Sequence, residues 1–203
     1  MTQHEHSDLV RVVPAYELDT LGAPFKVVLR DSVSVGLDPQ TGRERVSIPD
    51  FVGLVGAVVR SRVVHPRKLS GAEIKFLRSA LGVKAKPVAG FLDMSAEHLS
   101  RCEAGTKIMS STSERLFRLG AFLATFFEEP EDLFTSHSFE ELEIKPSADQ
   151  EQVAQRFLKH FLSLKIQTVF AADDVLRFEF FRRCAPDCKP CSDDGVWSDK
   201  KAA

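Results

Sequence analysis

The sequence has no long apolar run and few cysteines, and each absence excludes a class of protein. Its 203 residues include no stretch of the ~18 to 20 apolar residues that a membrane-spanning helix needs. The start, MTQHEHSDLV, lacks the apolar segment of a signal peptide, and three of the four cysteines crowd near the C-terminus. We therefore expect a soluble, cytoplasmic protein, and neither a membrane protein nor a disulfide-bonded secreted one.

Sequence motifs of common enzyme classes are also missing. There is no nucleophile elbow, no phosphate-binding loop and no dinucleotide-binding glycine pattern. The acidic pairs Glu128/Glu129 and Asp173/Asp174 are more typical of solvated helix ends than of acid/base dyads. The chain nevertheless contains 43% hydrophobic residues and 16 phenylalanines, which is enough for a folded core. We expect a folded protein that is not an enzyme and has no cofactor.

A net charge of only −2 conceals three segments of opposite sign. Residues 60–126 contain twelve Lys/Arg and five Asp/Glu, an excess of +7, whereas residues 1–59 carry −3 and residues 127–203 carry −6. A polyanion would be attracted to the middle segment, and the acidic flanks would limit non-specific binding. The distribution favours a nucleic-acid partner for the middle of the chain.

Residues 1–62 are predicted to form a small α+β appendage. Runs rich in β-branched residues at 25–29, 32–35 and 45–48 predict short strands, while residues 1–10 are expected to be frayed. The apolar stretch from Phe51 to Val59 follows Pro49-Asp50 and predicts a helix. These elements are too few for an enzyme-sized domain.

Between Leu69 and Leu119 the pattern predicts four short helices, at the centre of a helix-turn-helix domain over residues 63–127. Ser70-Gly71-Ala72-Glu73 is a capping box for the first helix, and Ser111-Thr112-Ser113-Glu114 is a second capping box, expected to begin the fourth. The second helix is predicted over 85–92 and the third over 96–103. The turn between them falls at Asp93-Met94, because Asp adopts the left-handed backbone region at modest cost.

The third of these helices is the predicted DNA-reading element, with its N-terminal residues facing the major groove. Arg101 is the candidate base contact, since a guanidinium can bind guanine O6 and N7 together; a phosphate contact or a solvated charge is the alternative. Glu97 either accepts a hydrogen bond from a cytosine amino group or is solvated. The predicted DNA-binding residues are Ser95, Ala96, Glu97, His98, Ser100 and Arg101 on this helix, and Lys84, Lys86 and Lys107 for phosphates.

At these residues the chain resembles the Xre/Cro-type helix-turn-helix regulators, and among them the MqsA (YgiT-type) antitoxin-like branch. The likeness lies in Leu69 to Arg78 and in Leu99 to Gly105, and more weakly in residues 16–29 and 46–54. It implies a dimeric, sequence-specific DNA-binding protein, usually a repressor, with Arg101 contacting a base. The zinc-binding cysteines of that branch's amino-terminal part are absent. Lys84-Ala85, Asp93, Glu97 and Cys102 replace the residues that the family commonly has at those positions.

Residues 128–203 are predicted to form an acidic linker, a helical extension and a loose tail. A third capping box at 147–150 begins an amphipathic helix. Its stripe of Val153, Phe157, Phe161 and Leu164 must be buried, either on the central domain or against a second copy of the chain. Residues 175–181 alternate as a strand would, with a helix as the alternative.

The crowded cysteines Cys184, Cys188 and Cys191 are weak zinc candidates. A structural zinc site has four ligands, and neither His137, His160 nor Cys102 has the spacing to supply the fourth. The last two tail cysteines also have redox spacing. We favour a reduced tail without metal.

As a whole, the sequence predicts a mainly α chain: a five-helix, lambda-repressor-like helix-turn-helix domain with an N-terminal α+β appendage and a C-terminal amphipathic helix. The predicted function is a transcriptional regulator, in particular a repressor, that binds an inverted-repeat operator in double-stranded DNA as a homodimer. The alternative is an antitoxin or anti-activator that binds a cognate toxin or regulator protein.

Overall fold

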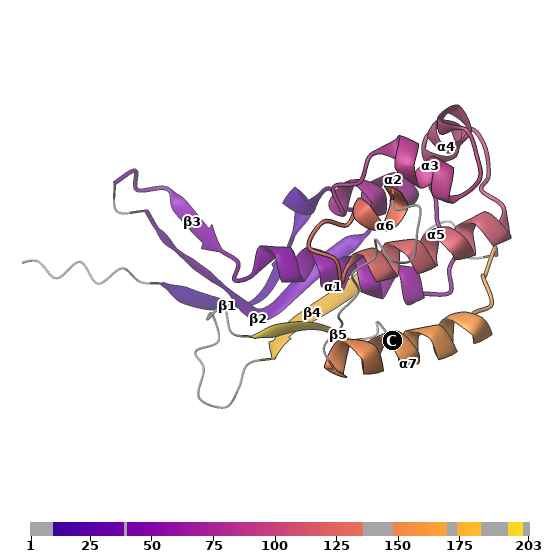
Figure 1. The fold of residues 1–203 in the computed structure, drawn as a ribbon. Helices are drawn as coiled ribbons and strands as arrows, with labels where there is room; N and C mark the ends of the chain where they lie inside the picture. The colour runs from indigo at the N-terminus through magenta and orange to yellow at the C-terminus, as the bar shows by residue number, and fades with distance from the viewer. Residues whose placement is uncertain (1–9, 39, 136–147, 170–173, 184–194, 201–203) are drawn as a thin grey trace, which may run out of the picture. The chain divides into compact units, whose positions relative to one another are not determined.

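The structure is a computed structural model that describes residues 10–38, 40–135, 148–169, 174–183 and 195–200. The strands are β1 (Arg11–Glu17), β2 (Lys26–Leu37), β3 (Glu44–Ser47), β4 (Arg177–Arg183) and β5 (Val196–Lys200) (Figure 1). The helices are α1 (Phe51–Val64), α2 (Gly71–Ala80), α3 (Ala85–Phe91), α4 (Ala96–Glu103), α5 (Ser111–Ala124), α6 (Asp132–Thr135) and α7 (Ala148–Ser163), with the short 3-10 helix η1 (Asp19–Leu21).

The chain divides into two compact units. Unit 1 contains the five strands, η1 and the first half of α1, and unit 2 contains the second half of α1 and helices α2 to α7. The division falls between Ala57 and Val58 inside α1 and between Asp174 and Val175. Residues from both ends of the sequence therefore belong to the same unit.

Unit 1 is organised by a mixed five-stranded sheet in the order β1-β2-β4-β5, with β3 also paired to β2. Strand β2 is antiparallel to β1 and β3 and parallel to β4, and β4 is antiparallel to β5. In the parallel pair, Lys26 lies opposite Arg177 and Arg30 opposite Phe181. Strand β2 is thus the element that joins the N-terminal strands to the C-terminal ones.

The prediction of a mainly α chain built on a five-helix, lambda-repressor-like bundle is wrong. The chain is an α/β protein, because the segments predicted as an appendage and as a C-terminal extension pair in one sheet. Residues 175–181, left open between strand and helix, are largely strand β4. The end of the predicted loose tail contains β5, in which the Trp197 side chain is buried.

Two irregularities explain why the N-terminal strands were predicted imperfectly. Strand β2 is one 12-residue strand and not two, but Asp31 in its middle has a positive φ of 48°. Strand β1, not predicted as a strand, contains Pro14, and its pairing with β2 shifts register between Val13 and Ala15. Proline cannot donate to a ladder, so its place at an irregularity is the expected one.

Apolar residues make up most of the core of unit 1, and an ion pair joins its parallel strands. Phe25 and Phe178 pack edge to face with ring centroids 5.3 Å apart, and Leu29 and Phe180 are fully buried. Arg30 donates from Nε and Nη2 to the two carboxylate oxygens of Glu179, at 3.2 and 2.6 Å. These hydrogen bonds hold the pKa of Glu179 below its ordinary value.

Helix α1 begins at Phe51, directly after Pro49-Asp50 as predicted, and continues beyond the predicted end at Val59, to Val64. Asp50, with a φ of 42°, accepts a hydrogen bond from the Gly53 backbone N–H at 2.9 Å. The Trp197 indole N–H donates to the Asp50 carbonyl at 3.1 Å. The start of the helix is therefore capped by its own Asp and joined to β5.

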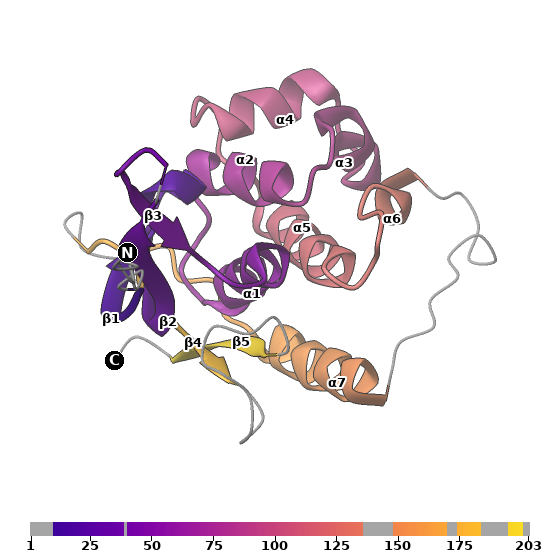
Figure 2. The same cartoon turned by 90° about the vertical axis from the view of Figure 1, so that its left-hand side faces the viewer.

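In unit 2, helices α2 to α5 lie close together (Figure 2). The capping box at Ser70 and Glu73 is confirmed, with both reciprocal hydrogen bonds present. The predicted box at Ser111 is wrong by one residue: Ser110 is the N-cap of α5 and accepts from the Ser113 N–H at 3.0 Å.

Glu114 is displaced from the predicted capping role because it belongs to a buried ionic network. Its carboxylate accepts from the Leu69 N–H at 2.9 Å, from Lys68 Nζ at 2.8 Å and from Arg118 Nη2 at 2.8 Å. Arg118, itself with no exposed surface, also donates to the carbonyls of Val63, His65 and Arg67. The network fixes the connection between α1 and α2 against α5.

A second Arg–Glu pair completes this network. Arg62, which is fully buried, donates from Nε to Glu73 at 2.6 Å and from its two terminal nitrogens to the carbonyls of Arg67 and Lys68. Burial alone would raise the pKa of Glu73, but the hydrogen bond and charge of Arg62 outweigh it and the pKa is lowered. Burial, together with the nearby arginines, lowers the pKa of His65 to about 4.

Helix α7 packs on its own chain at its C-terminal end. Leu164, the last residue of the predicted stripe, is buried, and its carbonyl accepts from Arg115 Nη2 at 3.2 Å. His160 Nε2 lies 2.9 Å from the Val64 carbonyl oxygen. The side chains of Val153 and Phe157 lie outside the described residues.

Over the ranges that the structure describes, none of the helices combines the length and the apolar character of a membrane span.

Candidate nucleic-acid interface

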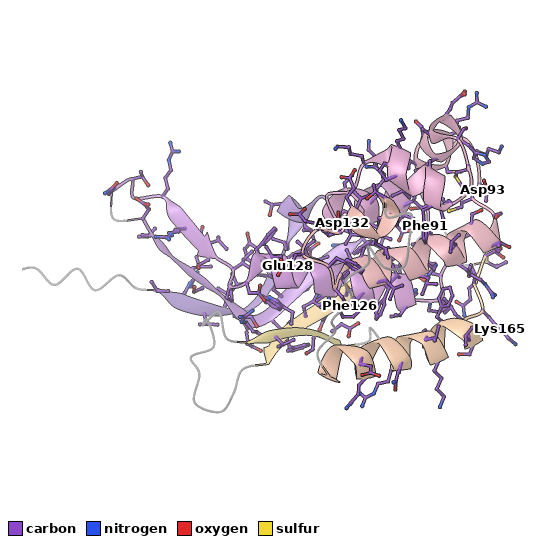
Figure 3. The ribbon with its side chains drawn as sticks, viewed as in Figure 1. Phe91, Asp93, Phe126, Glu128, Asp132 and Lys165 are labelled. Carbon is purple, nitrogen blue, oxygen red and sulfur yellow. The ribbon has the colours of Figure 1, made fainter. Side chains whose placement is uncertain are left out.

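The candidate interface is the pair α3 and α4 with the four-residue connection between them. The Asp93 N–H donates to the Gly90 carbonyl at 3.0 Å, and the Met94 N–H donates to the Ala89 carbonyl at 2.9 Å. Asp93 has a φ of 51°, as predicted for the turn, and lies at this connection in Figure 3. The predicted bounds of the helices on both sides agree with α3 and α4 to within one residue.

One side of α4 is fixed by packing against its neighbours. Leu99 has no exposed surface and Cys102 has 1%, while Ala89 on α3 is equally buried. Burial raises the pKa of the Cys102 thiol, which accords with a small packing residue. Ala89 and Leu99 are thus both core residues of the helix pair.

The end of α4 lies directly against the start of α2, at a glycine. A Cβ added to Gly71 would lie 2.3 Å from the Cys102 carbonyl oxygen and 2.8 Å from the Gly105 nitrogen. Both neighbours are backbone atoms, so they have no flexible side chain to move aside. Gly71 therefore allows an approach between α2 and α4 that any larger residue would prevent.

An ion pair that sequence reasoning missed holds the same two helices together. Arg78 on α2 donates from Nε and Nη2 to both carboxylate oxygens of Glu103, at 2.6 and 3.1 Å, and from Nη1 to the Val83 carbonyl. By helical spacing Arg78 lies on the polar face of α2, and periodicity alone does not reveal a charged partner on another helix. This bidentate pair limits the freedom of α4 to rotate on the unit.

The opposite side of α4 is open to solvent and contains most of the predicted DNA-contacting residues. Ser95 caps the helix by accepting from the His98 N–H at 3.1 Å. Exposure is high at Ser95, Ala96, Glu97, Ser100 and Arg101, whereas His98 is half-buried. The structure thus brings these residues together on one short helix and leaves their side chains accessible.

Arg101 and Glu97 form an ion pair on this exposed side. Arg101 Nη2 lies 2.6 Å from Glu97 Oε1, four residues back along α4, and the side chains are 61% and 74% exposed. Because a surface pair of this kind contributes only about 0.3 to 0.5 kcal/mol, either side chain can exchange its partner for a ligand at little cost. The guanidinium remains available for binding.

The three predicted phosphate-contacting lysines are also exposed. Lys84 precedes the first turn of α3 and is 82% exposed; its Nζ lies 3.8 Å from Glu131 Oε1. Lys86 lies on α3, and the Lys107 backbone N–H donates to the Arg101 carbonyl at 3.1 Å. Lys84 and Lys86 therefore flank one end of the helix pair, and Lys107 lies near the end of α4.

The predicted acidic linker contains a helix, α6, that packs on the candidate interface. Phe134 is buried and meets Phe91 of α3 edge to face, with ring centroids 5.2 Å apart. Gly120 on α5 leaves room for these rings, since a Cβ there would lie 2.9 Å from a ring carbon of Phe91. The apolar pair Leu133-Phe134 indicates a buried segment, but the acidic residues before it favoured the prediction of a linker.

The metal predictions stay predictions. Cys184, Cys188, Cys191 and His137 lie outside the described residues. In the ranges that the structure does describe, no three His, Cys, Asp or Glu side chains are grouped so that they could hold a metal ion.

Neither a protein-family model, a curated protein nor a solved structure matches this chain significantly. The residues of α3, α4 and their surroundings therefore provide the grounds for a functional proposal.

Proposed function

We propose that this chain is a sequence-specific DNA-binding protein, a transcriptional regulator that places α4 in the major groove. The observation that carries the proposal is the two-sided environment of α4. One side is held by Leu99, Gly71 and the Arg78–Glu103 pair, while the other side exposes Glu97 and Arg101. A helix that reads base edges needs both properties, a fixed orientation and an exposed row of polar side chains.

The charge distribution supports the same proposal. Within residues 60–126, the buried network contains two arginines and two glutamates, whose charges cancel. The +7 excess of that segment therefore belongs to the other residues, which include the exposed Lys84, Lys86 and Lys107. Exposed lysines attract phosphates by a sequence-independent, salt-dependent interaction.

In this proposal the protein acts as a homodimer on an inverted repeat, and as a repressor. The support for this part is the resemblance to Xre/Cro-type regulators. Two copies of α4 would contact half-sites about 34 Å apart, one turn of the double helix. Sedimentation of the protein with and without DNA, together with a footprint that contains two such half-sites, tests this part separately from DNA binding itself.

The deciding experiment compares two single substitutions on duplexes enriched from a random-sequence library. Arg101→Ala should weaken binding by about 1 to 3 kcal/mol and relax the preference at one base pair, because the base contact is lost. Lys84→Ala should weaken binding to all sequences alike and lower the slope of log K against log salt by about one, because a phosphate contact is lost. Unchanged affinity and preference in Arg101→Ala would refute the assignment of α4.

A second function is supported by the surface of unit 1. Leu37 on β2 and Val46 on β3 are 65% and 37% exposed and lie on the same face of the sheet, since Val46 is paired with Val35, two residues before Leu37. Exposed apolar side chains of this kind often mark a protein-binding surface, as an antitoxin or anti-activator needs for its toxin or regulator partner. Co-purification with the product of a neighbouring gene, without affinity for the chain's own promoter, would favour this alternative over DNA binding.

A further inference from the structure

The position of Glu97 is unfavourable for general DNA binding. Of the five acidic residues in 60–126, Glu73 and Glu114 are buried among arginines, and Glu103 is paired with Arg78. Asp93 forms the turn, which leaves Glu97 as the acidic residue on the exposed side of α4. A carboxylate there repels phosphates, so a specific contact must compensate for the repulsion if α4 meets DNA.

The ion pair brings the head groups of Glu97 and Arg101 together, so that both can face the same pair of bases. Their head groups lie 2.6 Å apart, although their Cα positions are separated by one helical turn. The two groups therefore present one combined surface, with donors on the guanidinium and acceptors on the carboxylate. Guanine offers only acceptors, O6 and N7, at its major-groove edge, and cytosine offers a donor, its N4 amino group.

We infer that Glu97 is a specificity-determining residue that requires a cytosine beside the guanine bound by Arg101. The inference deepens the proposed DNA binding and rests on it. The carboxylate accepts from cytosine N4, and thymine O4 and guanine O6 at that place repel it. Adenine also offers an amino donor, N6, but sets its acceptor N7 beside it, which the carboxylate disfavours. Glu97 also disfavours sites where only phosphates are available, because its charge repels them.

The test is selection of bound duplexes from a random-sequence library by the full chain and by its Glu97→Gln variant. The wild type should enrich sites that contain adjacent guanine and cytosine contacts. Glu97→Gln should keep the guanine and lose the cytosine preference by about tenfold, with adenine gaining, because a glutamine amide pairs with adenine N6 and N7. Arg101→Ala should do the reverse and lose the guanine.

The control is Glu129→Gln, which removes the same charge from an exposed position outside α4. It should leave the selected sequence unchanged. If Glu97→Gln also selects the wild-type sequence, the inferred role is overturned while DNA binding stands, and a uniform gain in affinity would then mark Glu97 as a repelling charge only. If the wild type enriches no sequence, the proposed function fails as well.

Discussion

Two Glu–Arg pairs with the same spacing occur in unit 2, and their surroundings are opposite. Glu97 and Arg101 on α4 lie 2.6 Å apart with side chains 74% and 61% exposed. Glu114 and Arg118 on α5 lie 2.8 Å apart and are fully buried. Both pairs place the glutamate four residues before the arginine, the favourable order for a helix.

The difference shows that burial, and not sequence spacing, separates an exchangeable surface pair from a structural one. In water the exposed pair is weak and exchangeable, so its members are suited to a ligand. The buried pair has lost its hydration and depends on every remaining partner, including Lys68 and the carbonyls of Val63 and His65. Stability should therefore depend on α5, and recognition on α4.

The largest effect is expected when the same substitution is made in both pairs. Glu114→Ala should lower the free energy of unfolding by about 3 to 5 kcal/mol, because it leaves Arg118 buried without a carboxylate. Glu97→Ala should change it by less than about 0.5 kcal/mol. Urea unfolding followed by circular dichroism measures both, and equal losses would abolish the distinction between the two pairs.

A smaller effect is expected at Gly71, where the start of α2 approaches the end of α4. Gly71→Ala should cost about 1 to 3 kcal/mol of stability, because its Cβ would overlap the backbone at Cys102. Gly90→Ala is the matched control: no atom lies within 4 Å of the added Cβ, so it should stabilise α3 by about 0.4 to 1 kcal/mol. Thermal unfolding of both variants would show whether the close approach of α2 and α4 at Gly71 limits stability.

The buried side of the comparison should also depend on pH. His65 has a pKa of about 4 in the folded chain against an ordinary 6.5, so between these values the unfolded chain binds a proton that the folded chain does not. Stability should therefore fall as pH is lowered from 6.5 toward 4. His65→Gln, which keeps an acceptor for the Arg67 N–H, should flatten this dependence in urea titrations. The lowered pKa of Glu73 adds a further loss only below 4.5.

Local patterns in the sequence were sufficient to predict the bounds of α3 and α4 and the exposed side of α4. The capping box at Ser70 and the turn at Asp93 depend on residues within a few positions of one another, and each is present. The exposed residues of α4 followed from the same periodicity that buries Leu99. Bounds and faces of short amphipathic helices are set mainly by such neighbours.

Long-range partners were not predictable in the same way. The pairing of β2 with β4 joins Arg30 to Glu179, 149 residues apart, and no spacing along the chain indicates it. Glu114 has the spacing of a capping residue in the sequence, but α5 has its N-cap one residue earlier, at Ser110, and Glu114 accepts a hydrogen bond from Lys68, 46 residues away. The mainly α prediction failed for this reason: the pairing of β2 with β4 joins the predicted appendage and the predicted extension in one sheet.

The parallel pairing of β2 and β4 also sets an order of events during synthesis. Strand β2 leaves the ribosome long before the residues of β4 exist, and helices α2 to α5 are complete in the interval. Until translation reaches Arg177, one edge of β2 has no β4 to pair with, and a strand with an open edge is prone to the wrong association. The proposed DNA-reading helices are therefore synthesised before β4 and β5 can join the sheet.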